Sequence, residues 1–159
     1  MTPIPATEPP PMADPAERRR WMGVLARASA EDIADRLAAL PSPAPAHARL
    51  RGPETGLVMV RGRAGGDGAA FNLGEMTVTR CAVRLPDGRV GHAYVAGRDA
   101  RQAELAALLD AMLQDAAARP ALDAAVIAPL AAAQAARREA EARRAAATRV
   151  QFFTMTQMR

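Results

Sequence analysis

The amino-acid sequence predicts an α+β fold, in which a small antiparallel sheet packs against helices and a long Ala/Arg-rich C-terminal helix leads into an extended tail. Three observations support this prediction. Capped helix patterns with an apolar face flank the middle of the chain on both sides. Strand-like runs joined by a turn signal lie between residues 57 and 95, and strong helix formers without large apolar side chains fill residues 131–147.

The first helices follow a proline-rich leader, residues 1–13, that we expect to be disordered because repeated prolines deny the backbone its hydrogen bonds. Asp14 and Glu17 form a capping box around Pro15, which fits a first helical position. Ser29 with Asp32 marks a second helix start. The apolar positions of the two helices recur at helical spacing, at Trp21, Val24, Leu25 and Ala28 and then at Ile33, Leu37 and Leu40.

The middle of the chain predicts three or more strands. Residues 57–60 form an unbroken apolar run, which is typical of a strand covered on both faces. Residues 71–85 are rich in Val, Thr and Met, and residues 90–95 return as the antiparallel partner. Pro86-Asp87-Gly88 between them is a turn signal, because proline presets φ and glycine accepts a positive φ.

The C-terminal half predicts two further helices. Asp99 caps a helix with an apolar stripe at Leu105, Leu108, Leu109, Met112 and Leu113, and Pro120 is expected to end it. The next helix carries a bend at Pro129 and continues into residues 131–147, which have no large apolar side chains to pack against a core. The expected division is a leader at 1–13, a single α+β domain at 14–130, and a helix and aromatic tail for subunit contact at 131–159.

The tail concentrates large apolar side chains at its end. Val150, Phe152, Phe153 and Met155 follow the weakly anchored helix, and exposed aromatic residues need a cover. The sequence allows two ways to bury these side chains: the tail folds back onto its own domain, or it forms a subunit interface with a neighbouring chain.

Composition narrows the function classes. All 21 basic residues are arginine, but 17 acidic residues are interspersed with them, and aromatic residues for base stacking are few. One cysteine, Cys81, allows no intrachain disulfide and fits a cytoplasmic protein. No signal peptide, membrane span, metal-binding motif or phosphate-binding P-loop is recognisable. An arginine-rich nucleic-acid-binding module remains the rival class.

One cluster has chemical interest. The guanidinium groups and glycine backbone of a loop after residue 60 are suited to phosphate oxygens, and the candidate phosphate-binding residues are Arg61, Arg63, Gly65, Gly66, Gly68 and Arg80. The alternative is a flexible hairpin loop flanked by surface arginines. A further alternative is an enzyme that acts on a phosphorylated substrate through Glu75 and His92.

Several segments, in order, resemble the G-subunit family of the bacterial carbon–phosphorus lyase core complex, the PhnG family. They cover nearly all of the chain except the leader, and they are residues 20–26, 54–58, 63–68, 71–80, 97–99 with 103–104, 127–130 and 149–155. Two positions depart from the family pattern, since Gln102 stands where the family commonly has histidine and Gln151 where it commonly has aspartate.

The resemblance implies a role in releasing phosphate from phosphonates. With the H, I and L subunits, the family joins methylphosphonate to C1 of the ATP ribose, which displaces adenine and gives ribose 1-methylphosphonate 5-triphosphate. The G, H, I and J subunits form the core complex. The resemblance assigns nucleosidase chemistry to the I subunit and radical chemistry, with an iron–sulfur cluster and S-adenosylmethionine, to the J subunit. It leaves this chain without a cofactor or metal of its own and with a structural or assembly role.

Overall fold

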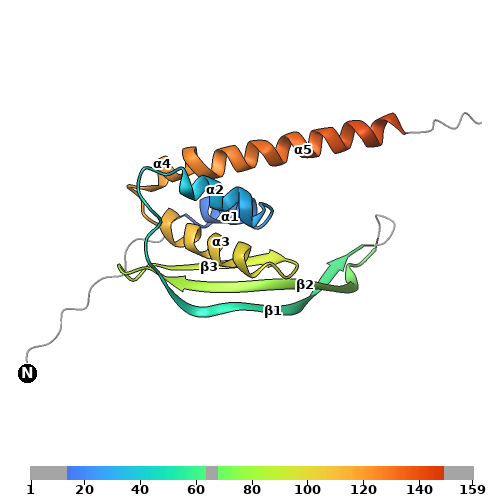
Figure 1. Cartoon of the computed structure of the whole chain (residues 1–159). Coiled ribbons are helices and arrows are strands. Elements are labelled where there is room, and N and C mark those ends of the chain that lie inside the picture. The colour runs from blue at the N-terminus through green and yellow to red at the C-terminus, as the bar shows by residue number, and fades with distance from the viewer. Residues whose placement is uncertain (1–13, 64–67, 149–159) are drawn as a thin grey trace, which may run out of the picture.

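Helices lie on one face of a three-stranded antiparallel sheet with the strand order β1-β2-β3 (Figure 1). This computed structural model describes residues 14–63 and 68–148. The strands are β1 (Ala48–Gly62), β2 (Phe71–Arg84) and β3 (Val90–Ala96). Within the part of the chain that is described, the other face of the sheet carries no helix (Figure 1). The predicted α+β class, with its small antiparallel sheet, is confirmed.

Two short helices open the fold at the predicted caps. α1 (Pro15–Leu25) starts where the Asp14 carboxylate accepts a hydrogen bond from the Ala16 N–H. α2 (Ala30–Ala38) starts where the Ser29 hydroxyl accepts one from the Asp32 N–H at 3.0 Å. In both cases a side-chain oxygen satisfies a backbone donor that the first helical turn leaves unpaired.

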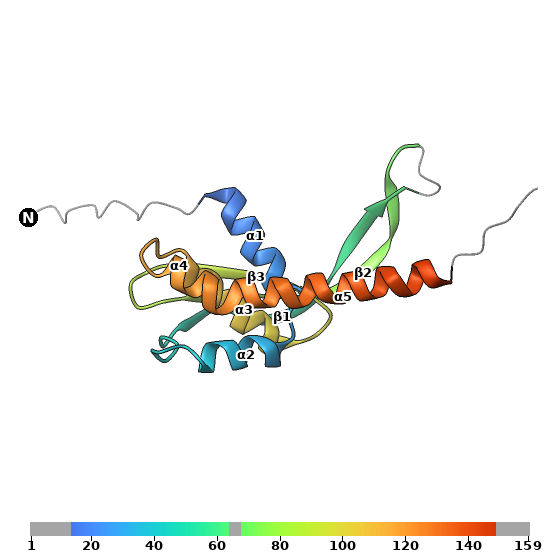
Figure 2. The same ribbon diagram turned by 90° about the horizontal axis from the view of Figure 1, so that it is seen from above.

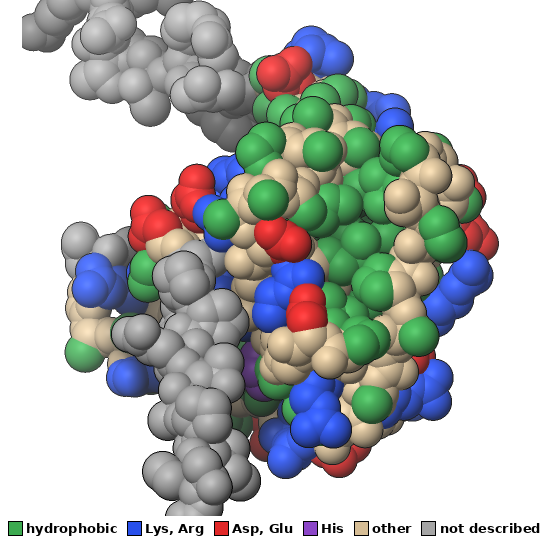
Figure 3. Space-filling model, turned by 90° about the vertical axis from the view of Figure 1, so that its left-hand side faces the viewer, with side chains coloured by type: hydrophobic (Ala, Val, Ile, Leu, Met, Phe, Trp, Pro, Cys, Tyr) green, Lys and Arg blue, Asp and Glu red, His purple; other side chains and the backbone are tan. Residues whose placement is uncertain are grey.

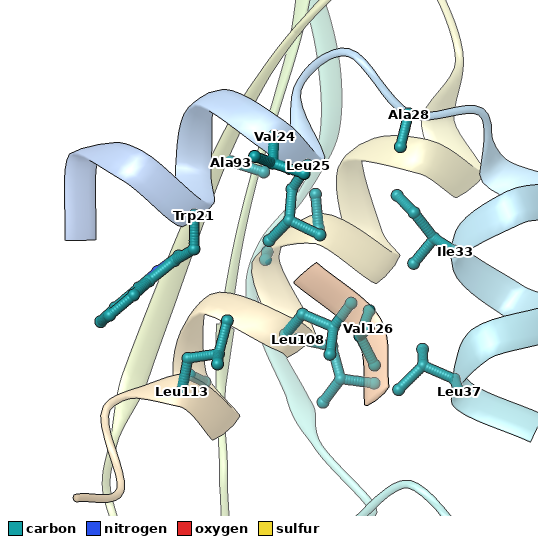
Figure 4. Close-up of a cluster of buried hydrophobic side chains, with 14 of the residues drawn as sticks. Trp21, Val24, Leu25, Ala28, Ile33, Leu37, Ala93, Leu108, Leu113 and Val126 are labelled. Carbon is teal, nitrogen blue, oxygen red and sulfur yellow. The ribbon is translucent and has the colours of Figure 1, made fainter. Parts of the chain in front are cut away.

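α3 (Ala100–Leu113) lies directly on β2 and β3 and forms the centre of the core. The close approach requires small residues. A Cβ added to Gly91 of β3 would lie 2.0 Å from the Ala107 carbonyl oxygen, so only glycine fits there. Large side chains from α1 and α2, including Trp21, fill the remaining space, and Figure 4 shows Leu25 and Ile33 pointing toward the same cluster.

The β1–β2 hairpin extends well past β3. β3 pairs with residues 78–84 of β2, whereas β1 pairs with β2 from Arg84 to Phe71. We call the two-stranded extension the arm, and it consists of residues 57–62 and 71–77. Its described part projects beyond the helical layer (Figure 2). The predicted strands are confirmed, but β1 begins at Ala48, nine residues before the expected run, and the expectation that residues 57–60 are covered on both faces is wrong for this chain alone.

The C-terminal helices are joined without a loop. α4 (Arg119–Leu122) passes through a π-helical turn, Asp123–Ile127, into α5 (Ala128–Ala147). The Ala128 N–H donates to the Asp123 carbonyl, a wider i→i−5 bond next to Pro129, which has no N–H of its own. Pro120 does not end α3, which stops at Leu113; it lies in the first turn of α4.

α5 is anchored at its start only. Leu130 and Gln134 are buried, and no described residue beyond Gln134 is. The rest of the helix extends past β3 toward the same side of the molecule as the arm (Figures 1 and 2). Among the described helices, none has the length and apolar character needed to cross a membrane.

Candidate functional site

Two of the predicted phosphate-binding residues, Arg61 and Arg80, lie far apart in the structure. Arg61 stands near the tip of the arm, where its Nη2 donates to the Ala70 carbonyl at 3.2 Å. Arg80 stands at the base, where its Nη2 donates to Glu54 Oε2 at 3.0 Å. Glu54 is the cross-strand partner of Arg80, seven residues before Arg61, which corresponds to about 23 Å along the strand.

The residues at the tip of the arm therefore remain the candidates for phosphate binding. Arg63 and Gly68, with a φ of 103°, are described there, whereas Gly65 and Gly66 lie outside the described residues. Arg61 and Arg63 stay predicted phosphate-binding residues, and Arg80 is engaged by a carboxylate.

Glu75 and His92 do not form an acid–base pair. Glu75 is paired with Met59 in the arm, and His92 is paired with Ala82 in the body of the sheet. Glu75 and Ala82 are seven positions apart along β2, which corresponds to about 23 Å, and this odd offset places the side chains of Glu75 and His92 on opposite faces of the sheet. The alternative that used both as catalytic residues is not supported by this geometry.

The most heavily bonded buried group is the carboxylate of Asp110 in α3, which is fully buried. Its Oδ1 accepts from Arg18 Nε at 3.0 Å and from Trp21 Nε1 at 2.9 Å. Its Oδ2 accepts from Arg18 Nη2 at 2.6 Å and from the backbone N–H of His92 at 2.9 Å. The paired Asp110 carboxylate raises the pKa of the Arg18 guanidinium. Four donors saturate this carboxylate, so it has no lone pair left for a substrate.

Two buried amides hold the end of α1. Gln102 Nε2 donates to the carbonyl oxygens of Ala28 at 2.6 Å and Ala26 at 3.2 Å, and Gln134 Nε2 donates to that of Val24 at 2.9 Å. The carbonyls of Val24 and Ala26 lie at the C-terminal end of α1, where intrahelical donors run out, and that of Ala28 lies in the turn that follows. Position 102, where the related family commonly has histidine, thus has a structural role in this chain.

A surface ion cluster ties β1 to α3. Glu104 accepts from Arg49 at 2.7 Å through each oxygen, and its Oε1 lies 3.1 Å from His47 Nε2. The Arg49 hydrogen bonds, followed by that of His47, hold the pKa of Glu104 below its usual range. Cys81 is buried nearby, as expected, and burial raises the pKa of its thiol, which makes it a poor nucleophile.

Catalytic machinery is not evident in the part of the chain that the structure describes. There, every buried polar side-chain atom has a hydrogen-bond partner, and no three His, Cys, Asp or Glu side chains are placed to hold a metal ion. A hollow of about 660 Å³ has mainly apolar walls from residues 40–45, 85–89 and 112–125 (Figure 3). The polar groups Arg89, Asp87 and Asp115 at this hollow are paired with one another.

The arm is the most unusual surface of the chain. Seven of its large apolar side chains are exposed, namely those of Leu57, Val58, Met59, Val60, Phe71, Leu73 and Met76. Leu57 and Met59 lie on one face, whereas Val58 and its cross-strand partner Met76 lie on the other. Exposed apolar residues on both faces of a ribbon mark a surface that another protein covers.

The sequence indicated another interface, and the structure leaves it untested. Val150, Phe152, Phe153 and Met155 lie outside the described residues. The apolar run at 57–60 is the sequence feature that indicates the arm. Its composition predicts burial of both faces, but it does not specify that another chain buries them.

Comparison with known proteins gives a match to a family model and a match to a curated protein. The family model described as phosphonate metabolism protein PhnG matches residues 16–157. A curated protein of Rhizobium meliloti (strain 1021), alpha-D-ribose 1-methylphosphonate 5-triphosphate synthase subunit PhnG, is 49% identical over 147 residues, which cover 88% of each chain.

Proposed function

The chain belongs to the PhnG family of phosphonate metabolism proteins, and we propose that it is an assembly subunit of an alpha-D-ribose 1-methylphosphonate 5-triphosphate synthase. The curated relative bears this enzyme's name as a subunit, so the working form is a complex of several chains. The proposed partners are the H, I and J subunits of the carbon–phosphorus lyase core complex, with the L subunit required for activity.

The proposed reaction of the complex joins methylphosphonate to the ribose of ATP. A phosphonate oxygen forms a bond to C1 of the ribose, the bond from C1 to adenine N9 breaks, and adenine leaves with the bonding electrons and takes up a proton. The triphosphate stays on C5. We assign this chemistry to the partner subunits. ATP is the substrate of the complex, and the iron–sulfur cluster and S-adenosylmethionine of later steps belong to partners rather than to this chain.

The observation that carries an assembly role is the exposed apolar arm. Burying a Leu, Val, Phe or Met side chain is worth about 1.5–3 kcal/mol each, so seven such side chains offer a partner a large stabilisation. In contrast, the buried polar groups that resemble catalytic residues, Asp110 and Gln102, are fully engaged in holding helices together. These observations favour a role in binding a partner subunit over a catalytic role.

Reconstitution tests the proposal. The purified chain and the purified H, I, J and L subunits are incubated with ATP and methylphosphonate, separately and together, and adenine release is followed by chromatography. We expect no release by the chain alone, release by the full mixture, and loss of release when this chain is omitted. Turnover by the chain alone, or full activity without it, would contradict the assembly role.

The rival nucleic-acid-binding function is tested with the same material. A gel shift with single- and double-stranded RNA and DNA at physiological ionic strength is expected to be negative for the chain and for the complex. Binding that weakens steeply with added salt would favour the rival class.

A further inference from the structure

The two edges of the sheet differ in how far their backbone groups are protected. An exposed strand edge presents unpaired N–H and C=O groups, and proteins protect such edges with side chains, prolines, charges or irregular pairing. β3 forms one edge, and side chains of α3 and of its C-cap residue Gln114 cap it. The His92 N–H donates to Asp110 at 2.9 Å, and the Val90 carbonyl accepts from Gln114 Nε2 at 2.8 Å.

The first part of β1, at the opposite edge, is protected by irregularity. Its pairing with β2 shifts between Arg49 and Arg51 and again between Arg51 and Glu54. Pro53 lies in the second irregular stretch and has no N–H to offer. Two arginines and two shifts within six residues make this stretch a poor template for another strand.

Residues 54–60 of β1 have almost none of this protection. They form seven consecutive regular pairs with β2, from Glu54 with Arg80 to Val60 with Gly74. The stretch holds no proline and one charged residue, Glu54. Among the described residues, no side chain bonds to the backbone of this stretch, and no element lies beyond β1 (Figures 1 and 2).

The backbone groups that face outward can be identified. The His92 N–H points away from β2, so the odd-numbered residues of β3 bond to their partners in β2, which are also odd-numbered. The Gly97 N–H, which donates to the Thr77 carbonyl at 2.9 Å, fits this pattern. Bonding directions alternate along a strand, so even-numbered residues of β2 bond to even-numbered residues of β1. Thr55, Leu57 and Met59 therefore direct their N–H and C=O groups to the open edge.

We propose that the outer edge of β1 over residues 54–60 binds an extended strand of another synthase subunit, which adds a fourth strand to the sheet. This inference rests on the proposed assembly function and specifies its contact. The incoming strand carries apolar side chains on both faces, because its neighbours on β1 are Leu57 and Met59 on one face and Val58 and Val60 on the other, all exposed.

A different subunit fits better than a second copy of this chain. Pairing β1 with β1 of a second copy would satisfy the edge but would bring a second arm with the same seven exposed side chains. Both faces of the joined arms would stay open to water. The partner must supply a strand together with a body that covers those faces, as a groove between packed elements does.

A matched pair of variants tests the backbone contact. Met59→Pro removes an outward N–H and leaves the hydrogen bonds to β2 in place, whereas Met59→Ala removes the side chain and keeps the N–H. We expect Met59→Pro to bind the co-expressed H, I and J subunits at least about tenfold more weakly than Met59→Ala, which corresponds to the loss of one main-chain hydrogen bond. Equal binding of the two variants would overturn the proposal.

Amide hydrogen exchange of the wild-type chain tests the strand addition even if Met59→Pro disturbs the hairpin. In the free chain, the amides of Gly56, Val58 and Val60 exchange slowly and those of Thr55, Leu57 and Met59 exchange fast. In the complex, the second group slows by on the order of a hundredfold. Unchanged fast exchange in an intact complex would overturn the strand addition, as would protection in a homodimer of the free chain. Failure of the wild-type chain to form any complex would instead refute the proposed function.

Discussion

The indole Nε1 of Trp21 donates a hydrogen bond of 2.9 Å to Oδ1 of Asp110, and both side chains are fully buried. The bond joins α1 to α3 at a point where the same carboxylate also pairs with Arg18. Removing the carboxylate would leave an indole N–H and a backbone N–H unpaired in the core, with a guanidinium group beside them.

Asp110→Ala is therefore expected to lower the free energy of unfolding by about 3–5 kcal/mol, the usual cost of breaking a buried charged pair. Urea titration followed by circular dichroism measures the change. Glu139→Ala on the exposed part of α5 is the control, because its ion pair with Arg143 at 3.9 Å is open to solvent. The control is expected to change stability by less than about 1 kcal/mol. Equal effects of the two substitutions would show that the Asp110 network does not stabilise the fold.

Gln102→Ala is expected to cost about 1–3 kcal/mol, because it leaves buried carbonyl groups at the end of α1 without donors. Gln102→His, which restores the residue common in the related family, is expected to cost less, since an imidazole N–H can donate to one of these carbonyls. Thermal unfolding of both variants checks the order. A larger loss for histidine than for alanine would contradict this role of the side chain.

The arm is expected to matter for assembly and little for the free fold. The double substitution Leu57→Ser with Met76→Ser removes an exposed apolar side chain from each face of the arm and is expected to change stability by about 1 kcal/mol or less. Co-purification with the H, I and J subunits is expected to be lost. Leu50→Ser is the matched control, since Leu50 is exposed on β1 but outside the arm. Equal retention of both variants would argue against the arm as the interface.

Stability is expected to fall in acid partly through Glu104. The pKa of this carboxyl is lowered in the folded chain, chiefly by Arg49. A carboxyl with a lowered folded pKa stabilises the fold above its unfolded pKa of about 4.3 and loses that contribution as pH falls through the folded value. Urea titrations at pH 7 and pH 3 are expected to show a smaller loss for Glu104→Gln than for the wild type. Parallel losses would exclude this contribution.

The tail makes a separate prediction from sequence. Deleting residues 148–159 is expected to abolish co-purification with the I subunit, since it removes Phe152 and Phe153 while leaving every described helix and strand complete. Circular dichroism of the shortened chain checks that the fold is kept. An intact complex after the deletion would place the subunit contact elsewhere.

Local signals in the sequence predicted most of the secondary structure. Asp14, Ser29 and Asp99 cap the helices that their spacing indicated, and the proline–glycine turn joins β2 to β3. These signals act over a few residues, so one sequence is enough to read them. The early start of β1 at Ala48 was missed, because residues 48–54 are held by pairing with β2 rather than by an apolar pattern of their own.

Long-range relationships were the part that the sequence could not predict. The Asp110 network joins residues 92 positions apart, and no local pattern announces that a carboxylate on an apolar helix will meet Arg18. The apolar run at residues 57–60 did signal burial on both faces. Hydrophobicity indicates how much of a strand is buried but not which chain buries it, so the run by itself predicts an interior strand.

The open edge of β1 also bears on how the chain is produced in a cell. A regular strand edge with few charges accepts other strands with little selectivity, including those of unfolded or identical chains. Copies made in excess of their partners would gather into insoluble deposits or be degraded. Balanced synthesis with the other subunits, or production from one shared transcript, keeps such orphan copies scarce.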